Sequence, residues 1–337
     1  MKNQTMPQTS DIDFVLTWVD GSDMQWQESK SHYRNPEEKF NRNNVRYRDW
    51  NLLHYWFRSV EAYAPWVRKI HVVTCGQVPD FLKREHPKLH LVNHTDYIPN
   101  QFLPTFNTNP ILLNLHRIEG LAEKFVNFND DVYLTAPVTP EDFFLNGLPR
   151  NCAAMNLPVA DRTGVGPIVM NNLGVLADHF DFMTQFRKNW KKYLSPVYGT
   201  KNLRTLMLLP WKRYVGFLDL HLTLPLLKST FEQVWAQEED LLNTVSSHKF
   251  RSDSDVSEWL MSYWQMASGN FMPGSPKIGK AFYVTGTVDP IVEIIRNQSM
   301  KVICINDDDS LEDFTALRDQ LVRAFDTHLG QKCSFEK

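Results

Sequence analysis

Short runs of aspartate follow three apolar stretches of the sequence, and carboxylates in such positions can bind a divalent cation. The runs are VDGSD at 19–23, NDD at 129–131 and INDDD at 305–309. Neighbouring carboxylates repel one another unless protons or a cation compensate their charge. Mg²⁺ or Mn²⁺ is the expected compensator, because both prefer carboxylate oxygens and often share a site with substrate phosphates. Aspartate runs also cap helices or form turns, but two strand-ending NDD motifs in one chain favour a cation site.

Arginine side chains could supply the positive charge that a diphosphate needs, since the planar guanidinium group matches phosphate oxygens. The candidates are Arg46, Arg58, Arg117 and Arg251. Each of them could equally be a solvated surface charge. Arg117 follows His116 near the end of an expected helix, where a cation also complements the helix dipole without any catalytic role.

His221 is a further candidate for chemistry. It lies between apolar residues in LDLHLTLPLL (218–227), and on this context alone a packed histidine is more common than a base. A histidine that titrates near neutral pH can also accept the proton of a hydroxyl group. The residues alone therefore leave both interpretations open.

The elements that must position these residues form an alternating pattern. Apolar, β-rich segments at 13–19, 69–75, 89–93 and 124–129 are separated by helix-period segments, among them 49–62 and 109–120. This alternation predicts an α/β fold, a Rossmann-like and mostly parallel sheet that is flanked by helices. Ligands of such sheets bind beyond the carboxyl ends of the strands. Two of the aspartate runs follow strands of this set.

The second half of the chain has a different character. Residues 175–265 carry several tryptophans among charged, helix-forming stretches and show no strand pattern, which predicts an α-rich insertion or lid. The strand pattern returns at 300–306, a segment that we expect to rejoin the first sheet, and a closing helix is expected at 311–329. We therefore expect one catalytic unit over 1–337, with an α/β core at 11–150 and 270–330.

Composition excludes several classes of protein. The 36 Lys+Arg and 39 Asp+Glu give a net charge of −3 without an evident basic block, which disfavours nucleic acid as a partner. The apolar runs are shorter than the ~20 residues that span a bilayer. Neither a secretory signal nor an amphipathic basic anchor is evident, so we expect a cytoplasmic protein with at most peripheral association with the inner face of the membrane. The oligomeric state is open.

Several motifs together resemble the four conserved blocks of the Stealth family. In order they are DIDFVLTWVDGSD (11–23), APWVRKI (64–70), LPTF (103–106), HRIEGL (116–121), NDD (129–131), HLTLP (221–225), FRSDSDVSEW (250–259) and VICINDD (302–308). The family includes bacterial capsular-polysaccharide phosphotransferases and the catalytic part of the lysosomal-enzyme GlcNAc-1-phosphotransferase. The resemblance spans about residues 11–310, and its second block is the most specific part.

The resemblance implies a reaction. A hexose-1-phosphate, GlcNAc-1-phosphate or a similar group, would move from a UDP-sugar donor to a hydroxyl of a glycan or polysaccharide acceptor, with release of UMP and formation of a phosphodiester. Mg²⁺ or Mn²⁺ would assist. In such phosphoryl transfer, catalysis comes mostly from alignment and charge stabilisation. The core at 11–150 and 270–330 would then bind the nucleotide sugar.

Roles for individual residues follow from matching positions in the motifs. Asp131 resembles the catalytic carboxylate, His221 the active-site histidine that would act as general base, and Arg251 the arginine that faces phosphate. The cation would be held by Asp130, Asp131 and Asp307. The residues that would bind the substrate are Thr17, Trp18, Val19, Asp20, Gly21, Thr74, Gly76, Arg117 and Asn129.

Two alternative functions remain at this stage. A metal-dependent UDP-sugar glycosyltransferase would attack the anomeric carbon and release UDP instead of UMP. An inert glycan-binding module would bind glycans without turnover, but glycan binding alone does not call for strand-end carboxylates together with arginines.

Overall fold

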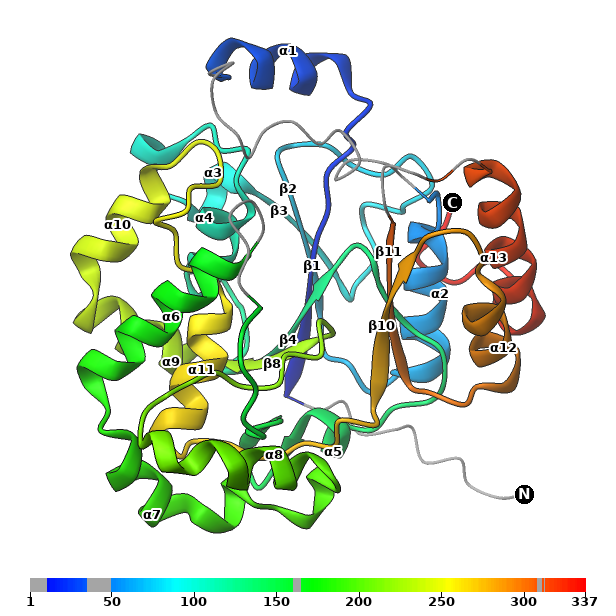
Figure 1. The fold of residues 1–337 in the computed structure, drawn as a ribbon. Coiled ribbons are helices and arrows are strands. Elements are labelled where there is room, and N and C mark those ends of the chain that lie inside the picture. The colour runs from blue at the N-terminus through cyan, green and yellow to red at the C-terminus, as the bar shows by residue number, and fades with distance from the viewer. Residues whose placement is uncertain (1–10, 35–49, 160–164, 308–310, 312) are drawn as a thin grey trace.

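The computed structural model describes residues 11–34, 50–159, 165–307, 311 and 313–337. Its centre is a five-stranded sheet in the order β3-β2-β1-β4-β8, in which the first four strands are parallel and β8 is antiparallel to β4 (Figure 1). These strands are β1 (Ile12–Thr17), β2 (Ile70–Thr74), β3 (Leu89–Asn93), β4 (Lys124–Asn129) and β8 (Leu224–Leu227). The predicted fold class, a mostly parallel sheet flanked by helices, is confirmed.

β1 is the middle strand of this sheet, and both of its faces are buried. Because successive side chains of a strand alternate, Phe14 and Leu16 pack into one core while Val15 packs into the other. The strand therefore reads as a continuous apolar run, as is usual for parallel sheets covered on both sides.

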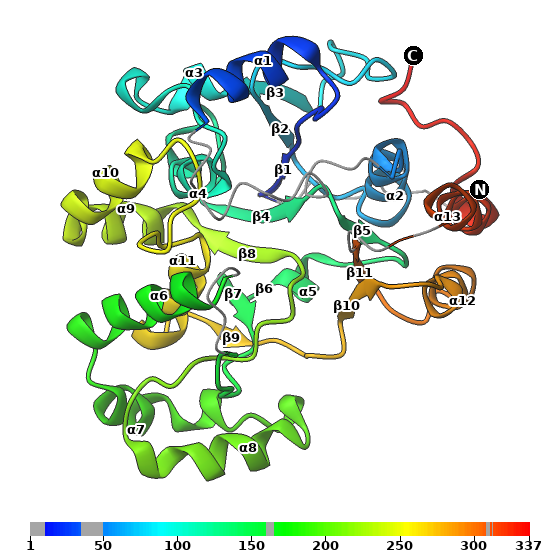
Figure 2. The same ribbon diagram turned by 45° about the horizontal axis from the view of Figure 1, so that its top comes forward.

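Helices cover the two faces of the sheet (Figures 1 and 2). On one side lie α2 (Leu53–Tyr63), α12 (Asp289–Asn297) and α13 (Phe314–Leu329). On the other side lie α4 (Thr108–Leu113), α6 (Gly166–His179), α9 (Lys228–Gln237), α10 (Glu239–Ser247) and α11 (Trp259–Ser268). The remaining helices are α1 (Met24–Tyr33), α3 (His94–Tyr97), α5 (Pro140–Phe143), α7 (Phe182–Tyr193) and α8 (Lys201–Leu208).

Two small sheets complete the fold. β10 (Gly279–Val284), β11 (Val302–Asp307) and β5 (Val132–Leu134) form one of them, and β6 (Phe144–Leu145), β7 (Leu148–Asn151) and β9 (Met272–Pro273) form the other. The expectation that segment 300–306 rejoins the first sheet is wrong. The edge beside β4 is occupied by β8, and β11 pairs instead with β10 and β5.

The expectation that residues 175–265 contain no strand is also wrong, because β8 lies within this segment. Pro225 interrupts its pattern, and a proline is tolerated there because β8 is an edge strand. The helix expected at 109–120 is shorter than predicted, since α4 ends at Leu113 and a 3-10 turn follows over Leu115–Arg117.

The division into a core and a lid stays a prediction. Among the described residues, none of the helices has the length and apolar character that crossing a bilayer requires.

Candidate active site

A cavity of about 340 Å³ lies at the carboxyl end of β1 and β4. Its walls come from segments that are far apart in the sequence. Among the residues singled out from the sequence, those that line it are Thr17, Trp18, Val19, Asn129, Asp130, Asp131, His221 and Arg251. The three residues that were matched to catalytic positions therefore share one cavity.

Strand pairing explains how these segments meet. Thr17 and Asn129 are partners in the parallel pair of β1 and β4, so both strands end at the same edge of the sheet. β8 runs antiparallel to β4, and its first residue Leu224 pairs with Asn127 near the end of β4. The turn that precedes β8, which contains His221, is consequently carried to the place where Asp131 follows β4.

Asp131 is held by the neighbouring strand β11. The thiol of Cys304 donates to Oδ2 of Asp131 at 3.3 Å, and Nδ2 of Asn306 donates to that sulfur at 3.3 Å. The other oxygen, Oδ1, is shielded from solvent and has no hydrogen-bond partner among the described residues. Burial raises the pKa of Asp131, although His221 and the thiol partly oppose this. A buried carboxylate oxygen without a donor is suited to a cation.

The thiol of Cys304 acts as a hydrogen-bond donor. Cys304 is fully buried, and burial together with the nearby Asp131 carboxylate raises its pKa well above the usual range of a thiol. The protonated sulfur can therefore donate to Asp131 near neutral pH.

His221 has a backbone that is unusual for a residue with a side chain. Its φ is 50°, in the left-handed region, and its N–H donates to Oδ1 of Asp219 at 2.8 Å. Its ring lies edge-on to Trp259, with 6.1 Å between centroids. Ligand-capable atoms of Asp131, His221 and Cys304 all lie within 4.8 Å of one another. The turn thus holds the imidazole beside the carboxylate.

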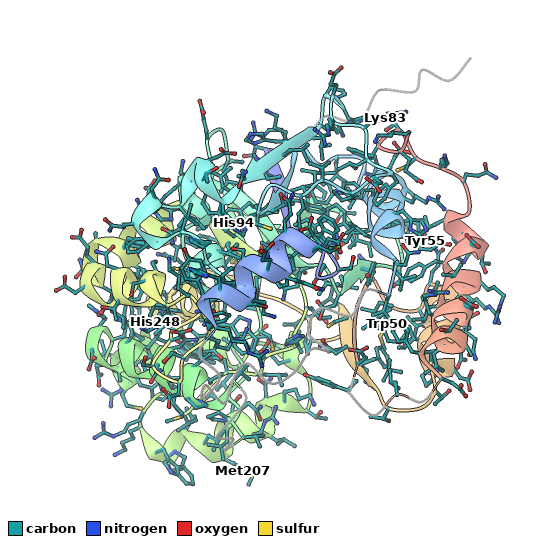
Figure 3. The ribbon with its side chains drawn as sticks, turned by 90° about the horizontal axis from the view of Figure 1, so that it is seen from above. Trp50, Tyr55, Lys83, His94, Met207 and His248 are labelled. Carbon is teal, nitrogen blue, oxygen red and sulfur yellow. The ribbon has the colours of Figure 1, made fainter. Side chains whose placement is uncertain are left out.

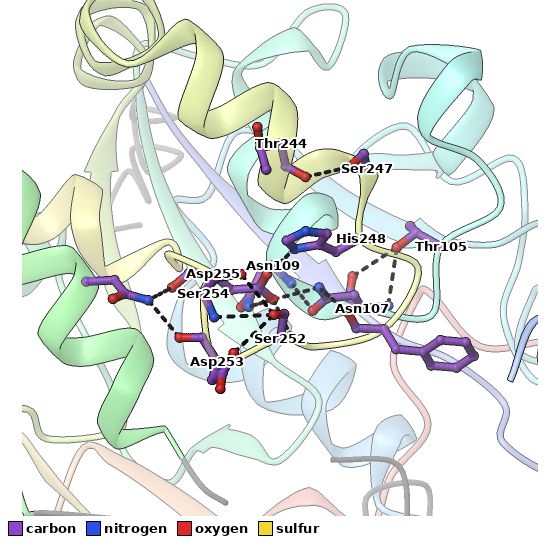
Figure 4. Close-up of polar contacts among 12 residues, drawn as sticks. Thr105, Asn107, Asn109, Thr244, Ser247, His248, Ser252, Asp253, Ser254 and Asp255 are labelled. Atoms are coloured by element: carbon purple, nitrogen blue, oxygen red, sulfur yellow. Dashed lines mark hydrogen bonds and ion pairs between the residues drawn. The ribbon is translucent and has the colours of Figure 1, made fainter. Parts of the chain in front are cut away.

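The loop after α10, which includes Arg251, is held by a buried carboxylate, Asp255. Figure 4 shows the contacts of Asp255. Oδ2 of Asp255 accepts hydrogen bonds from Nδ2 of Asn107 and Nδ2 of Asn109, both at 2.8 Å. Its Oδ1 lies 2.6 Å from Nδ1 of His248. Both the 105–108 segment and Arg251 line the cavity, so Asp255 fixes two parts of the wall to each other.

Sequence reasoning missed several residues of the cavity wall. Trp26 and Lys30 on α1, His94 at the start of α3 and Phe106 all line it. The ammonium group of Lys30 lies 5.0 Å from the ring centroid of Trp26, and burial lowers the pKa of His94 to about 4. His94 is therefore neutral near neutral pH. Figure 3 labels His94 next to helix α1.

Four of the predicted substrate-binding residues lie beside this cavity instead of lining it. Oγ1 of Thr74 accepts from the N–H of Gly76, and Gly76, with a φ of 101°, lines an adjoining cavity of about 430 Å³. The N–H of Asp20, which precedes Gly21, donates to Oε1 of Gln77 at 2.8 Å. The two cavities share Trp26 and His94 in their walls, and Gly76 and Gln77, the partner of Asp20, line the second one.

Two predicted residues are not brought to the cavity wall. The guanidinium carbon of Arg117 lies 4.5 Å from the ring centroid of Trp235, and Arg117 does not line the cavity. Asn306 lines the cavity and Asp307, the next residue of β11, does not, because neighbouring side chains of a strand point to opposite sides. Asp307 as a metal ligand stays a prediction; the group of ligand-capable atoms close to one another in the described residues consists of Asp131, His221 and Cys304. Asp308, Asp309 and Arg46 lie outside the described residues.

Arg58, another arginine candidate, has a structural role. Its Nε and Nη2 donate to the two carboxylate oxygens of Glu336 at 2.6 and 2.8 Å, and its Nη1 donates to the carbonyl of Leu329. These bonds tie the C-terminal segment to α2.

Comparison with known proteins identifies the family. The model of Stealth protein conserved region 1 matches residues 10–35, and that of conserved region 2 matches residues 46–151. The chain is 39% identical over 334 residues to a capsular polysaccharide phosphotransferase, WcwK, of Streptococcus pneumoniae, covering 98% of this chain and 100% of the relative. The chain belongs to the Stealth family.

Other relatives of this Stealth protein agree over nearly the whole length. A receptor polysaccharide phosphotransferase, WefC, of Streptococcus gordonii is 42% identical over 330 residues, which cover 96% of this chain and 98% of the relative. An exopolysaccharide phosphotransferase of Lactiplantibacillus plantarum is 38% identical over 331 residues, which cover 97% of this chain and 96% of the relative. The Stealth protein described here is accordingly a phosphotransferase.

Proposed function

We propose that this Stealth protein transfers a hexose-1-phosphate from a UDP-sugar to a hydroxyl group of a polysaccharide acceptor. The acceptor oxygen attacks the β-phosphorus, and the bond between that phosphorus and the bridging oxygen of the diphosphate breaks. UMP leaves, a phosphodiester forms, and the hydroxyl proton goes to the enzyme. The names of the relatives, which are capsular, receptor and exopolysaccharide phosphotransferases, support this class of acceptor.

The observation that carries the proposal is the shared cavity of Asp131, His221 and Arg251. The same cavity is lined by the Thr17–Val19 segment at the carboxyl end of β1, where ligands of α/β sheets bind. We assign the nucleotide to this segment and the diphosphate to the space between Asp131 and Arg251.

The donor set at Asp131 fits a hard divalent cation. Oδ1 of Asp131 is buried without a donor, and Asp130 and Asn129 add further oxygen atoms to the cavity wall. Carboxylate and amide oxygens are the ligands that Mg²⁺ and Mn²⁺ prefer. Asp131 and Asp130 would hold the ion, which would neutralise charge on the diphosphate. Cys304 remains a hydrogen-bond donor to Asp131, since a protonated thiol is a poor ligand for these ions.

His221 and Arg251 complete the assignment. We assign His221 as the general base, because the turn before β8 holds its ring within 4.8 Å of the Asp131 carboxylate. The guanidinium group of Arg251 would stabilise negative charge on the transferred phosphoryl group, for which its fork of donors is suited.

Product analysis tests the proposal. The purified protein is incubated with a panel of UDP-sugars, oligosaccharide acceptors and Mg²⁺, and the released nucleotide is identified by mass. We expect UMP and a phosphodiester signal in the phosphorus NMR spectrum, both lost in Asp131→Asn and after chelation of divalent cations. The control variant is Asp80→Asn, at an exposed aspartate outside the cavity. Release of UDP would contradict the proposal and indicate attack at the anomeric carbon.

A further inference from the structure

Positive charge is concentrated in segment 182–213 of the chain. It contains eight of the 36 Lys+Arg and none of the 39 Asp+Glu, so the rest of the protein is distinctly acidic. The segment comprises α7, α8, the turn between them and the 3-10 turn that follows α8. The expectation that the chain has no basic block is therefore wrong. The cations are spread over some thirty residues, which hides them from a search for consecutive charges.

Large apolar side chains of the same segment face solvent. Trp190, Leu203, Leu206, Met207 and Trp211 are between 49% and 74% exposed. Leu203, Met207 and Trp211 are four residues apart along α8 and the 3-10 turn that continues it, so they lie on one side of the helix. Thr205 and Leu208 lie on the buried side. The apolar stripe of α8 thus faces outward.

These helices form one end of the molecule. In Figures 1 and 2, α7 and α8 lie side by side at the end opposite α1. Met207 lies at the outer edge of the molecule in Figure 3. We define the α7–α8 surface by the five apolar residues above and by the exposed cations Arg187, Lys188, Lys191, Lys201, Lys212 and Arg213.

We propose that the α7–α8 surface docks onto an anionic membrane surface. Helices that lie in a membrane interface combine Lys and Arg with outward-facing Trp and Leu, whereas soluble monomers rarely expose large apolar side chains in groups. Each cation near an anionic bilayer adds attraction, and tryptophan favours the level of the headgroups. A soluble polyanion would use the cations but would leave Leu203, Met207 and Trp211 in water.

Self-association is the other way to cover these apolar residues. The six exposed cations of this surface would then face the same six cations of a second copy, because symmetric dimers bring identical surfaces together. Charge complementarity therefore favours an anionic bilayer. Docking in this way does not depend on which nucleotide the enzyme releases.

Vesicle flotation tests the proposal with the full chain. We expect the protein to float with vesicles of phosphatidylcholine and phosphatidylglycerol and not with vesicles of phosphatidylcholine alone. One variant carries Leu203→Ser, Met207→Ser and Trp211→Ser, and we expect it to float less with the anionic vesicles than the unaltered protein. A second carries Lys201→Gln, Lys212→Gln and Arg213→Gln, and should partition on the order of a hundredfold more weakly. A matched control carries Lys83→Gln, Lys277→Gln and Lys280→Gln, which removes the same charge elsewhere, and should float like the unaltered protein.

Four outcomes would overturn the proposal. They are absence of flotation with anionic vesicles, equal flotation with both kinds of vesicle, unchanged flotation of either surface variant, and an equal loss in the control. Binding to soluble polyphosphate that is tighter than binding to vesicles would replace the membrane with a polyanion. A dimer that the serine substitutions convert to a monomer, measured by sedimentation without vesicles, would assign the surface to self-association. Melting temperatures of all variants show whether they are folded, since every substituted side chain is exposed.

Discussion

The thiol of Cys304 lies 3.3 Å from Oδ2 of Asp131 and donates a hydrogen bond to it. The bond joins β11 of one sheet to the residues that follow β4 of another. In the proposed function it would orient the carboxylate and leave Oδ1, which has no hydrogen-bond partner among the described residues, for the cation. Under this proposal Cys304 would be a positioning residue that acts on the substrate through Asp131.

Replacement of Cys304 tests this role. In Cys304→Val the shape of the side chain is nearly kept but the donor is lost, and a hydrogen bond to a charged group is worth about 1.5–3 kcal/mol. We expect kcat to fall by roughly 10- to 100-fold with little change in KM for the UDP-sugar. Cys304→Ser retains a donor and should recover much of the loss. Equal kcat in the valine and serine variants would show that the thiol only fills space.

His221→Gln should depress the chemical step. Removal of a general base typically costs about 10²- to 10⁴-fold in rate, so we expect kcat to fall while the dissociation constant of the UDP-sugar stays close to its original value. Single-turnover kinetics and calorimetric titration measure the two quantities separately. His328→Gln, at an exposed histidine of α13, is the control. A maximal rate that survives the His221 substitution would leave the residue with a packing role.

Arg251→Lys should be damaging although the charge is retained. Lysine lacks the planar fork of donors that matches two phosphate oxygens, and we expect kcat/KM to fall by about tenfold or more. Arg84→Lys, at an exposed arginine after β2, should have no effect. Full activity of the Arg251 variant would argue against contact with phosphate.

Asp255→Asn should destabilise the loop that carries Arg251. The amide can keep its oxygen towards Asn107 and Asn109 only by turning its NH2 group towards Nδ1 of His248, so that one carboxylate acceptor is lost at a cost of about 1–3 kcal/mol. We expect a lower free energy of unfolding in urea and a higher KM. Asp253→Asn, at a neighbouring exposed aspartate, is the matched control. Identical denaturation midpoints for the two variants would contradict the role of Asp255.

The pair of Arg58 and Glu336 predicts a loss of stability in acid. Burial alone would raise the pKa of Glu336, but the hydrogen bonds from Arg58 and from the N–H of Cys333 hold it at about 2, below its ordinary value of 4.5. A carboxyl group whose pKa is lowered by folding stabilises the protein above its ordinary pKa, and this contribution is lost as the pH falls towards its folded value. We expect Glu336→Gln to be less stable at pH 7 by about 2 kcal/mol.

The loss of stability at low pH provides a second measurement of this ion pair. Between pH 4.5 and about 2, the unaltered protein should lose more stability than the Glu336→Gln variant. Parallel curves in this range, measured by urea denaturation at each pH, would show that the pair makes no contribution.

The sequence allowed the position of Asp131 to be predicted, because an apolar run followed by NDD indicates the end of a strand. The approach of Cys304 could not be predicted in this way. VICI reads as a core strand, and Cys304 meets Asp131 only because β11 pairs with β5, in the register of Cys304 with Val132. The outward stripe of α8 escaped prediction for a similar reason, since apolar residues at helical spacing usually mark the buried side of a helix.

β8 is an edge strand that the C-terminal half of the chain contributes to a sheet built by the N-terminal half. The N-terminal half alone leaves the cavity wall incomplete, because His221, Arg251 and Asn306 also line it. Under the proposed assignment, a chain that ends before β8 would contain Asp131 but would lack the general base His221 and the phosphate-facing Arg251. Under the proposed function, catalysis would accordingly require both halves of the chain to be folded together.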